Sequence, residues 1–231
     1  MNHHSLEIRE LESVRDHTLL FSMLSFKAEA GTITQIGGEN GSGKTSLLRI
    51  LTGLAPAESG EVLWKGKSIQ KGRADYAAAL TFIGHLPGIK APLTPLENLS
   101  WLAPASSQSD CIDALAKVGL RGYEESPCYR LSAGQKRRAA LARLYLEKRQ
   151  IWILDEPFTA IDKAGVEKLE ALLVKHAEQG GIVILTTHHE LNIGGANYQQ
   201  ISLDRSLKHD GSEIRGPENH NPENQGSTNY G

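Results

Sequence analysis

Several features that are common in secreted and membrane proteins are scarce in this sequence. Only two cysteines occur in 231 residues, Cys111 and Cys128, and they form no CxxC pair. They supply no disulfide framework, and so few thiols fit a reducing cytoplasm. The N-terminus lacks the basic start and apolar run of a secretory signal, and no stretch approaches the roughly 18 apolar residues that cross a bilayer. We therefore expect a chain that is soluble by itself, with any membrane spans supplied by another chain.

An excess of charge of either sign is also absent. Lys and Arg total 25 against 27 Asp and Glu, which gives a formal charge of −2 and a pI near 6.5. This balance does not indicate a dedicated surface for nucleic acid or anionic membranes. The basic run Lys136-Arg137-Arg138 continues into alanines and leucines, and we interpret it as a solvated helix face with snorkelling side chains. We predict no nucleic-acid partner.

The pattern of apolar residues predicts an α/β domain. Two continuous apolar runs, 151–154 and 182–185, are typical of parallel strands covered by helices on both faces, and a helix is predicted between them at 166–179. Residues 6–36 have the texture of strands, whereas prolines, short loops and helical patterns begin at residue 87. From residue 204 to 231 few apolar residues remain, and we predict a disordered polar tail there.

A glycine-rich segment carries the strongest chemical signal in the sequence. Residues 38–45 satisfy G-x-x-x-x-G-K-[ST] between an apolar strand and a predicted helix, and both flanks disfavour an accidental match. Glycines let backbone N–H groups converge on phosphates, a lysine adds charge at the β- and γ-phosphates, and a threonine hydroxyl can ligate Mg²⁺. ATP and Mg²⁺ are the predicted cofactors, and the nucleotide-binding residues are Gly38, Glu39, Asn40, Gly41, Ser42, Gly43, Lys44, Thr45 and Ser46.

Two carboxylates and a histidine follow the apolar runs. Asp155 and Glu156 end the run at 151–154, and parallel-sheet ligands gather beyond the carboxyl ends of strands. Asp155 fits a position at Mg²⁺, with Thr45, and Glu156 would accept a proton from the attacking water or orient it. His188 follows the run at 182–185 and is predicted to contact the γ-phosphate. The adjacent pair His188-His189 as a metal site is a less favoured alternative, because no third ligand is evident.

A capped helix start gives the sequence a family resemblance. Ser132 and Gln135 have capping-box spacing at the start of a helix predicted to run to Leu146, although an ordinary capped helix is the alternative. The segment resembles the LSGGQ signature peculiar to ABC ATPases, with Ala133 departing at the third position; its residues are Leu131, Ser132, Ala133, Gly134 and Gln135. The resemblance implies that this helix tip caps the γ-phosphate held by a second copy of the chain. Asp162 matches the D-loop of that family, which crosses the dimer interface.

The resemblance implies a fold and extends to one family. An ABC-type P-loop NTPase has a parallel-sheet core, an antiparallel β subdomain and a small inserted helical subdomain, here expected at about 87–140 within an ATPase domain at 1–203. Segments 61–64, 83–90, 96–99, 131–135, 151–162 and 180–188 together resemble the cytochrome c maturation ATPases known as heme exporter protein A. That likeness implies an ATPase on the cytoplasmic face of the bacterial inner membrane, seated on integral membrane subunits of the cytochrome c maturation system. No direct haem binding is expected, and haem export and release of a haem-loaded chaperone both stay open.

Three local expectations concern departures from the family pattern and the partner surface. His85 stands where most ABC domains carry the Q-loop glutamine, and it could ligate Mg²⁺, hydrogen-bond the water, or merely pack at the subdomain hinge. No tyrosine is present near 15–17 to stack on adenine, so Arg15 and His17 are the candidates. An apolar surface at 86–102, with Leu93, Leu99 and Trp101, is predicted to dock the membrane partners, unless it is internal core. The rival functions are an ABC ATPase acting on nucleic acid, another ABC importer or exporter, and a P-loop kinase or nucleotide switch.

Overall fold

A five-stranded parallel sheet forms the centre of the molecule. The computed structural model describes residues 4–193 and 197–203, and the tail predicted at 204–231 lies outside these residues. The strand order is β6-β7-β8-β3-β9, and every neighbouring pair is parallel. Residues of the two apolar runs are buried throughout, as expected for strands covered on both faces. The strands are β3 (Thr32–Gly37), β6 (Leu80–Ile83), β7 (Ile151–Asp155), β8 (Ile182–Thr186) and β9 (Asn197–Ser202).

The strand register brings the functional strand ends to one edge. Thr186 at the end of β8 pairs with Asp155 of β7 on one side and with Ile36 of β3 on the other. Because parallel strands point the same way, the segments that follow these three strands emerge together. The phosphate loop, the two carboxylates and the histidines therefore share one edge of the sheet.

An antiparallel sheet forms the second layer, with the order β2-β1-β4-β5. The hairpin between its first two strands turns through Asp16 and His17, whose φ angles are 50° and 61°. Two successive positive φ angles match the right-handed twist of the paired strands, and Asp and His are among the non-glycine residues that tolerate this conformation. The strands are β1 (Ser5–Arg15), β2 (Thr18–Glu29), β4 (Ser59–Trp64) and β5 (Lys67–Ser68).

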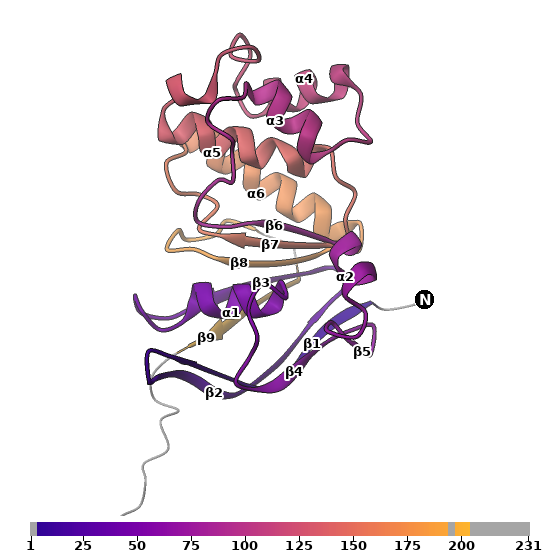
Figure 1. Ribbon diagram of the computed structural model, residues 1–231, viewed down its shortest axis with the longest axis vertical. Coiled ribbons are helices and arrows are strands. Elements are labelled where there is room, and N and C mark those ends of the chain that lie inside the picture. Colours follow the sequence, from indigo (N-terminus) through magenta and orange to yellow (C-terminus); the bar gives the residue numbers. More distant parts are fainter. Residues whose placement is uncertain (1–3, 194–196, 204–231) are drawn as a thin grey trace, which may run out of the picture.

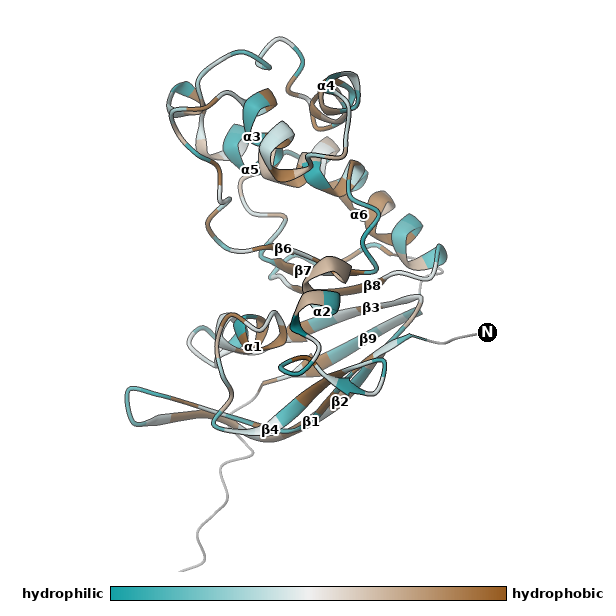
Figure 2. Ribbon diagram, turned by 45° about the vertical axis from the view of Figure 1, so that its right-hand side comes forward, coloured by the Kyte–Doolittle hydropathy of each residue, from teal (hydrophilic) through white to brown (hydrophobic). Residues whose placement is uncertain are grey.

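Helices cover both faces of the parallel sheet. Helix α1 (Lys44–Leu51) lies between the two sheets, where its leucines join a core shared with the antiparallel strands (Figure 1). Helix α6 (Lys163–Glu178) covers the opposite face through Leu169, Leu173 and Ala177. Figure 2 shows the same layering from a second direction, with the short helix α2 (Arg73–Ala79) beside the sheets. The parallel sheet with helices on both faces confirms the predicted α/β fold.

A group of short helices packs beyond α6 around a core of its own (Figure 1). Three helices in it begin with a capping box, at Thr94, Ser107 and Ser132. The elements are α3 (Pro95–Leu102), α4 (Gln108–Lys117), the 3₁₀ turn η1 (Cys128–Arg130), α5 (Ala133–Leu141) and the 3₁₀ turn η2 (Ala142–Tyr145).

Two sequence expectations about this helical group need correction. Leu99, expected on a docking surface, is fully buried in the core of the group, whereas Trp101 is 61% exposed. Leu99 and Trp101 are two residues apart and so lie on opposite faces of the helix, which the apolar character of 86–102 could not distinguish. The helix expected to run to residue 146 instead tightens into η2 after Leu141. Among the described residues, no helix is long and apolar enough to cross a membrane.

Candidate active site

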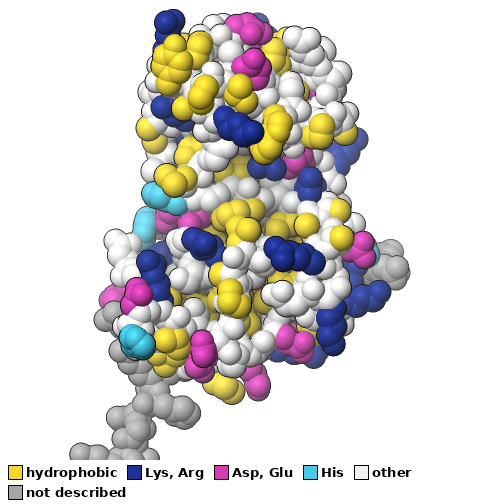
Figure 3. Space-filling view, in the orientation of Figure 1, with side chains coloured by type: hydrophobic (Ala, Val, Ile, Leu, Met, Phe, Trp, Pro, Cys, Tyr) yellow, Lys and Arg dark blue, Asp and Glu magenta, His cyan; other side chains and the backbone are white. Residues whose placement is uncertain are grey.

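A cleft of about 620 Å³ opens at the carboxyl edge of the parallel sheet. Figure 3 shows histidine and acidic side chains together at the left of the molecule, where the helical group meets the rest of the chain. The cleft brings together most of the predicted site residues from five separate parts of the sequence. Its lining comprises Arg15, Asp16, Thr18, Leu20, Asn40, Gly41, Gly43, Lys44, Thr45, Ser46, His85, Asp155, Glu156, Thr159 and His188.

The phosphate loop wraps the start of helix α1. Gly38, Gly41 and Gly43 have φ angles of 134°, 83° and 103°, a region that side-chain-bearing residues rarely adopt. A Cβ at Gly43 would also lie 3.0 Å from the Cβ of Leu20. The Lys44 ammonium donates to the carbonyl oxygens of Gly38 at 2.7 Å and Glu39 at 3.0 Å, which folds the side chain over the loop. A helix N-terminus with a lysine above it is a fitting site for a phosphate chain.

Asp155 is 2% exposed, and each of its carboxylate oxygens accepts a hydrogen bond from a hydroxyl group. Thr45 donates to Oδ2 at 3.0 Å, and Thr186 donates to Oδ1 at 2.7 Å. The Thr45 contact joins the phosphate loop to the end of β7 across the floor of the cleft. A carboxylate and a hydroxyl group are hard oxygen donors, so this pair fits Mg²⁺ held together with nucleotide phosphates and water.

Glu156 follows immediately with an unusual backbone. Its φ is 50°, a left-handed conformation that costs a non-glycine residue of order 1–3 kcal/mol. The Glu156 amide donates to the hydroxyl group of Thr186 at 2.9 Å and to its carbonyl oxygen at 3.2 Å. The Glu156 side chain is 19% exposed and lines the cleft. The surrounding contacts therefore fix this carboxylate at the position where the sheet ends.

The histidines separate into different environments. The His188 ring is 64% exposed, and its Nε2 lies 3.6 Å from Oε1 of Glu156, within the cleft. The His189 ring turns away to Glu170, with Nε2 3.2 Å from Oε1. Across residues 4–193 and 197–203, no cluster of three or more His, Cys, Asp or Glu side chains could hold a metal ion. His85 is exposed and lines the same cleft as Glu156 and His188.

Arg137 corrects the interpretation of the basic run as a solvated face. The side chain of Arg137 is buried, with 4% exposure. Its guanidinium donates to four backbone carbonyl oxygens on either side of the cleft: Gly84 at 2.7 Å, His85 at 3.4 Å, Asp155 at 2.6 Å and Glu156 at 2.8 Å. Burial lowers the pKa of Arg137, and the nearby carboxylates of Asp155 and Glu156 oppose that shift.

Sequence reasoning missed two residues of this site, Arg137 and Thr186. The fully buried Thr186 hydroxyl group bonds the Asp155 carboxylate and the Glu156 amide, yet in the sequence Thr186 is only a threonine after an apolar run. Arg137 had a weak signal, because it lies three and four residues before Ala140 and Leu141, on the face of the helix that these residues bury. Neither position belongs to a motif whose chemistry could have identified it.

The signature segment does not line the cleft of its own chain. Ser132 and Ala133 are exposed. The Ser132 hydroxyl accepts from the Gln135 amide at 3.2 Å, and the Gln135 side chain accepts from the Ser132 amide at 2.9 Å. The predicted capping box is therefore confirmed, and it presents the helix tip outward. Leu131 is buried behind it.

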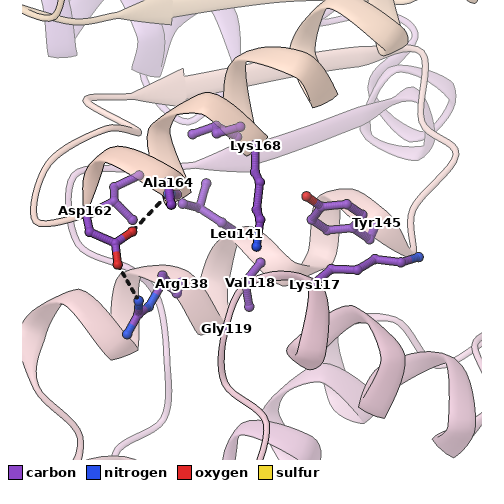
Figure 4. A pocket seen from close by; sticks show the side chains of 12 residues that line it. Lys117, Val118, Gly119, Arg138, Leu141, Tyr145, Asp162, Ala164 and Lys168 are labelled. Atoms are coloured by element: carbon purple, nitrogen blue, oxygen red, sulfur yellow. Dashed lines mark hydrogen bonds and ion pairs between the residues drawn. The ribbon is translucent and has the colours of Figure 1, made fainter.

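Asp162 and the adenine candidates lie at two further positions. Asp162 caps helix α6 by accepting from the Gly165 amide at 2.9 Å, and it lies 3.6 Å from the guanidinium of Arg138 (Figure 4). Arg15 lines the cleft at the hairpin tip and lies 3.5 Å from Asp16. His17 occupies the same turn but is not part of the lining of the cleft.

Comparisons with known proteins agree with this geometry. Residues 21–159 match the family described as "ABC transporter". The chain is 53% identical over 198 residues to the cytochrome c biogenesis ATP-binding export protein CcmA of Escherichia coli O157:H7, and equally so to that of Shigella flexneri, covering 86% of this chain and 96% of each relative. A putative ABC transporter ATP-binding protein from Pyrococcus furiosus superposes with a TM-score of 0.74 at 25% identity, covering 86% of this chain and 97% of the other.

Two more distant structures share the fold. A bacterial Atm1-family ABC exporter with ATP bound gives a TM-score of 0.76 at 20% identity over 88% of this chain and 38% of the other. A dimeric post-hydrolysis ATP-binding cassette bound to ADP and phosphate gives 0.71 at 21% identity, covering 81% of this chain and 89% of the other. The protein is an ATP-binding ATPase subunit, and the chain belongs to the ABC transporter family, within the cytochrome c biogenesis ATP-binding export proteins.

Proposed function

We propose that this chain is the ATP-hydrolysing subunit of a transporter complex that powers a haem-handling step in c-type cytochrome biogenesis. The 53% identity to cytochrome c biogenesis ATP-binding export proteins over nearly their whole length supports this assignment. The observation that carries the mechanism is that the two helix N-termini expected to bind phosphate, those of α1 and α5, do not face the same cleft in one chain. The phosphate loop lines the cleft, whereas the signature helix of the same chain points outward from it.

The cleft residues divide the work of hydrolysis. Lys44 would leave its loop carbonyls to neutralise the β- and γ-phosphates, and Thr45 with Asp155 would hold Mg²⁺, which supplies further charge neutralisation when bound. Glu156 would accept a proton from the attacking water or orient it, and His188 would contact the γ-phosphate. Water attacks in line, and ADP and phosphate leave. His85, on the rim, would hydrogen-bond the water or the metal.

A second copy of the chain would complete each site. In a face-to-face pair, the outward tip of helix α5, with Ser132 and the N–H of Gly134, would approach the γ-phosphate bound by the other copy. Asp162 would lie along the interface between the copies. ATP closes the pair because it is bound from both sides, and hydrolysis reopens it. Arg15 at the hairpin tip would stack on the base, since its planar side chain already lines the cleft.

Integral membrane subunits would receive the opening and closing motion. Leu86 and Trp101 are 80% and 61% exposed, and the Lys90 ammonium lies 3.5 Å from the centroid of the Trp101 ring. These residues, with the half-buried Leu93, keep an apolar surface within 86–102 although Leu99 is internal. The chain would then sit on the cytoplasmic face of the bacterial inner membrane and would itself bind no haem.

Glu156→Gln tests the two-copy mechanism. The substitution removes the proton acceptor but keeps the shape of the side chain, so we expect phosphate release to fall by more than about 100-fold while ATP binding persists. ATP should then hold the variant as a stable dimer in light scattering, whereas the wild-type chain should return to monomers as ATP is consumed. A variant that binds ATP yet remains monomeric at every concentration would contradict the proposed pairing.

A separate experiment tests the biological process. Cells that lack the gene should lose haem-stained c-type cytochromes, and the wild-type gene should restore them. The Glu156→Gln gene should fail to restore them although its product accumulates normally. Normal haem staining in the deletion strain would refute the role in cytochrome c biogenesis and leave the ATPase activity untouched.

A further inference from the structure

Arg137 is buried in the signature helix at a place where packing alone does not require an arginine. All four of its hydrogen bonds go to backbone carbonyl oxygens, at residues 84, 85, 155 and 156. Removing a guanidinium from water is costly, and an apolar side chain of similar volume fills such a space without that cost. Its placement therefore points to a role for the contacts themselves.

The contacts hold the backbone beneath the predicted proton acceptor. Glu156 has a strained φ of 50°, and its carbonyl oxygen is held by Arg137 at 2.8 Å and by the Thr159 amide at 3.2 Å. Asp155 offers its carbonyl oxygen to the same guanidinium at 2.6 Å. Without Arg137, the peptide on either side of Glu156 would be free to relax toward an unstrained conformation. Such a rotation would move the carboxylate away from the cleft.

Two further contacts tie the same helix to the segment 155–162. Arg138 lies 3.6 Å from Asp162, and both side chains line the same small pocket (Figure 4). Gly134 lies against the carbonyl oxygen of Ala160 so closely that a Cβ would overlap it. Helix α5 and the segment that carries Glu156 are therefore connected at three successive points. A movement of the helix tip would therefore act on that segment through these contacts.

We propose that Arg137 is a positioning residue that holds Glu156 of its own subunit and couples it to the signature helix, whose tip serves the ATP of the partner. Closure of the helix on the nucleotide of one site then sets the geometry of the proton acceptor in the other site. This inference rests on the proposed two-copy mechanism. Arg137 would thus act in cis, on Glu156 of its own subunit, although the tip of the same helix acts in trans, on the ATP bound by the partner.

Three variants separate an effect on the position of Glu156 from an effect on the stability of the fold: Arg137→Met, Arg137→Lys and a matched control. Because Arg137 does not line the nucleotide cleft, we expect Arg137→Met to lower kcat by about 10- to 100-fold and to change the KM for ATP by less than about threefold. Lysine can donate to only part of the four carbonyl oxygens, so Arg137→Lys should recover part of kcat. Arg143 is also largely buried, and it pairs with Glu147 at 3.2 Å away from the cleft. Arg143→Met should keep the wild-type kcat.

Mixed dimers of two differently tagged copies distinguish action in cis from action in trans. In the first dimer, one copy carries Arg137→Met and the other Glu156→Gln, so the remaining active Glu156 belongs to the Arg137→Met copy. In the second dimer, one copy carries both substitutions and the other is wild-type. We expect the first dimer to lose activity by about tenfold or more relative to a wild-type/Glu156→Gln dimer, and the second to match that reference.

Each alternative result overturns the inference. Equal loss in both dimers would mean a general defect of the signature helix, and the activity of the wild-type/Glu156→Gln reference in both would mean that Arg137 positions nothing. Arg137→Lys replaces Arg137→Met in the same dimers if the methionine variant shows no cooperative thermal unfolding. The Glu156→Gln homodimer is the independent check. If ATP does not assemble this homodimer, the proposed function is wrong. If it assembles but the mixed dimers do not show the loss of activity only in the first dimer, only the role of Arg137 is wrong.

Discussion

Replacement of Thr186 by valine removes a single hydroxyl group from the junction of β7, β8 and the cleft. The Thr186 side chain is fully buried, and valine has nearly the same shape, so no cavity or clash is introduced. The hydroxyl group donates to Oδ1 of Asp155 at 2.7 Å and accepts from the Glu156 amide at 2.9 Å. The substitution therefore removes two hydrogen bonds at once, both of them to the predicted Mg²⁺ and proton-transfer residues.

The size of the effect follows from the partners that are left behind. A hydrogen bond to a charged carboxylate contributes about 1.5–3 kcal/mol, and a neutral one about 0.5–1.5 kcal/mol. The Glu156 amide keeps its second acceptor, the Thr186 carbonyl oxygen at 3.2 Å, so the neutral loss is partial. Asp155 keeps only the Thr45 hydroxyl group in the apo protein. We expect the free energy of unfolding to fall by about 2–4 kcal/mol, which a typical domain survives.

Urea denaturation without nucleotide measures the stability, and phosphate release at saturating Mg²⁺ and ATP measures kcat. Thr81→Val is the matched control, because Thr81 is also fully buried and donates to a carboxylate, that of Glu147, at 2.7 Å. We expect both variants to lose comparable stability. Only Thr186→Val should lose kcat, by about tenfold or more, and should need more Mg²⁺ for half-maximal activity.

Two results would refute the reasoning. A Thr186→Val protein with wild-type kcat and Mg²⁺ dependence would show that the hydroxyl group does not orient Asp155 or Glu156. An equal loss of kcat in Thr81→Val would show that the activity follows stability alone.

Two further predictions concern buried polar groups outside the cleft. Burial lowers the pKa of His176, stacked 3.7 Å from Trp152, from 6.5 to about 4. As the pH falls from 6.5 toward 4, His176 becomes protonated in the unfolded chain but stays neutral in the folded chain, so the free energy of unfolding should fall by at most about 3 kcal/mol. His176→Phe should reduce this pH dependence in urea titrations across the same range. An unchanged pH dependence in the variant would show that His176 does not cause the loss. Asn98 is 1% exposed and bonds the Lys90 amide and carbonyl group at 2.8 and 3.1 Å. Asn98→Ala should cost about 2–3 kcal/mol and speed hydrogen exchange at the Lys90 amide, whereas wild-type exchange there would show that Asn98 does not hold the loop.

Local features of the site could be predicted because each depends on only a few neighbouring residues. The glycines of the phosphate loop need positive φ angles, and the sequence places glycine at each of them. The capping box of Ser132 and Gln135 lies within one helical turn. The buried strands read as apolar runs because parallel strands are covered on both faces. Known strand polarity then placed the residues after β7 and β8 beside the phosphate loop.

Contacts between distant segments could not be predicted in the same way. Arg137 lies in a basic run whose other two members are only half-buried, and its own burial depends on carbonyl oxygens 52 and 18 residues away in the sequence. Thr186 gains its role only when β7 and β8 pair in the observed register, so that it lies opposite Asp155. Leu99 and Trp101 are both apolar, and only the packing of α3 on α4 decides which is internal.

The sequence by itself determined the nucleotide chemistry, the strand and helix types and the outward signature tip, because short-range sterics and hydrogen bonding define those features within a few residues. Only the tertiary structure decided which polar groups hold the reactive carboxylates, because hydrogen bonds between segments far apart in the chain depend on the register and packing of the whole sheet.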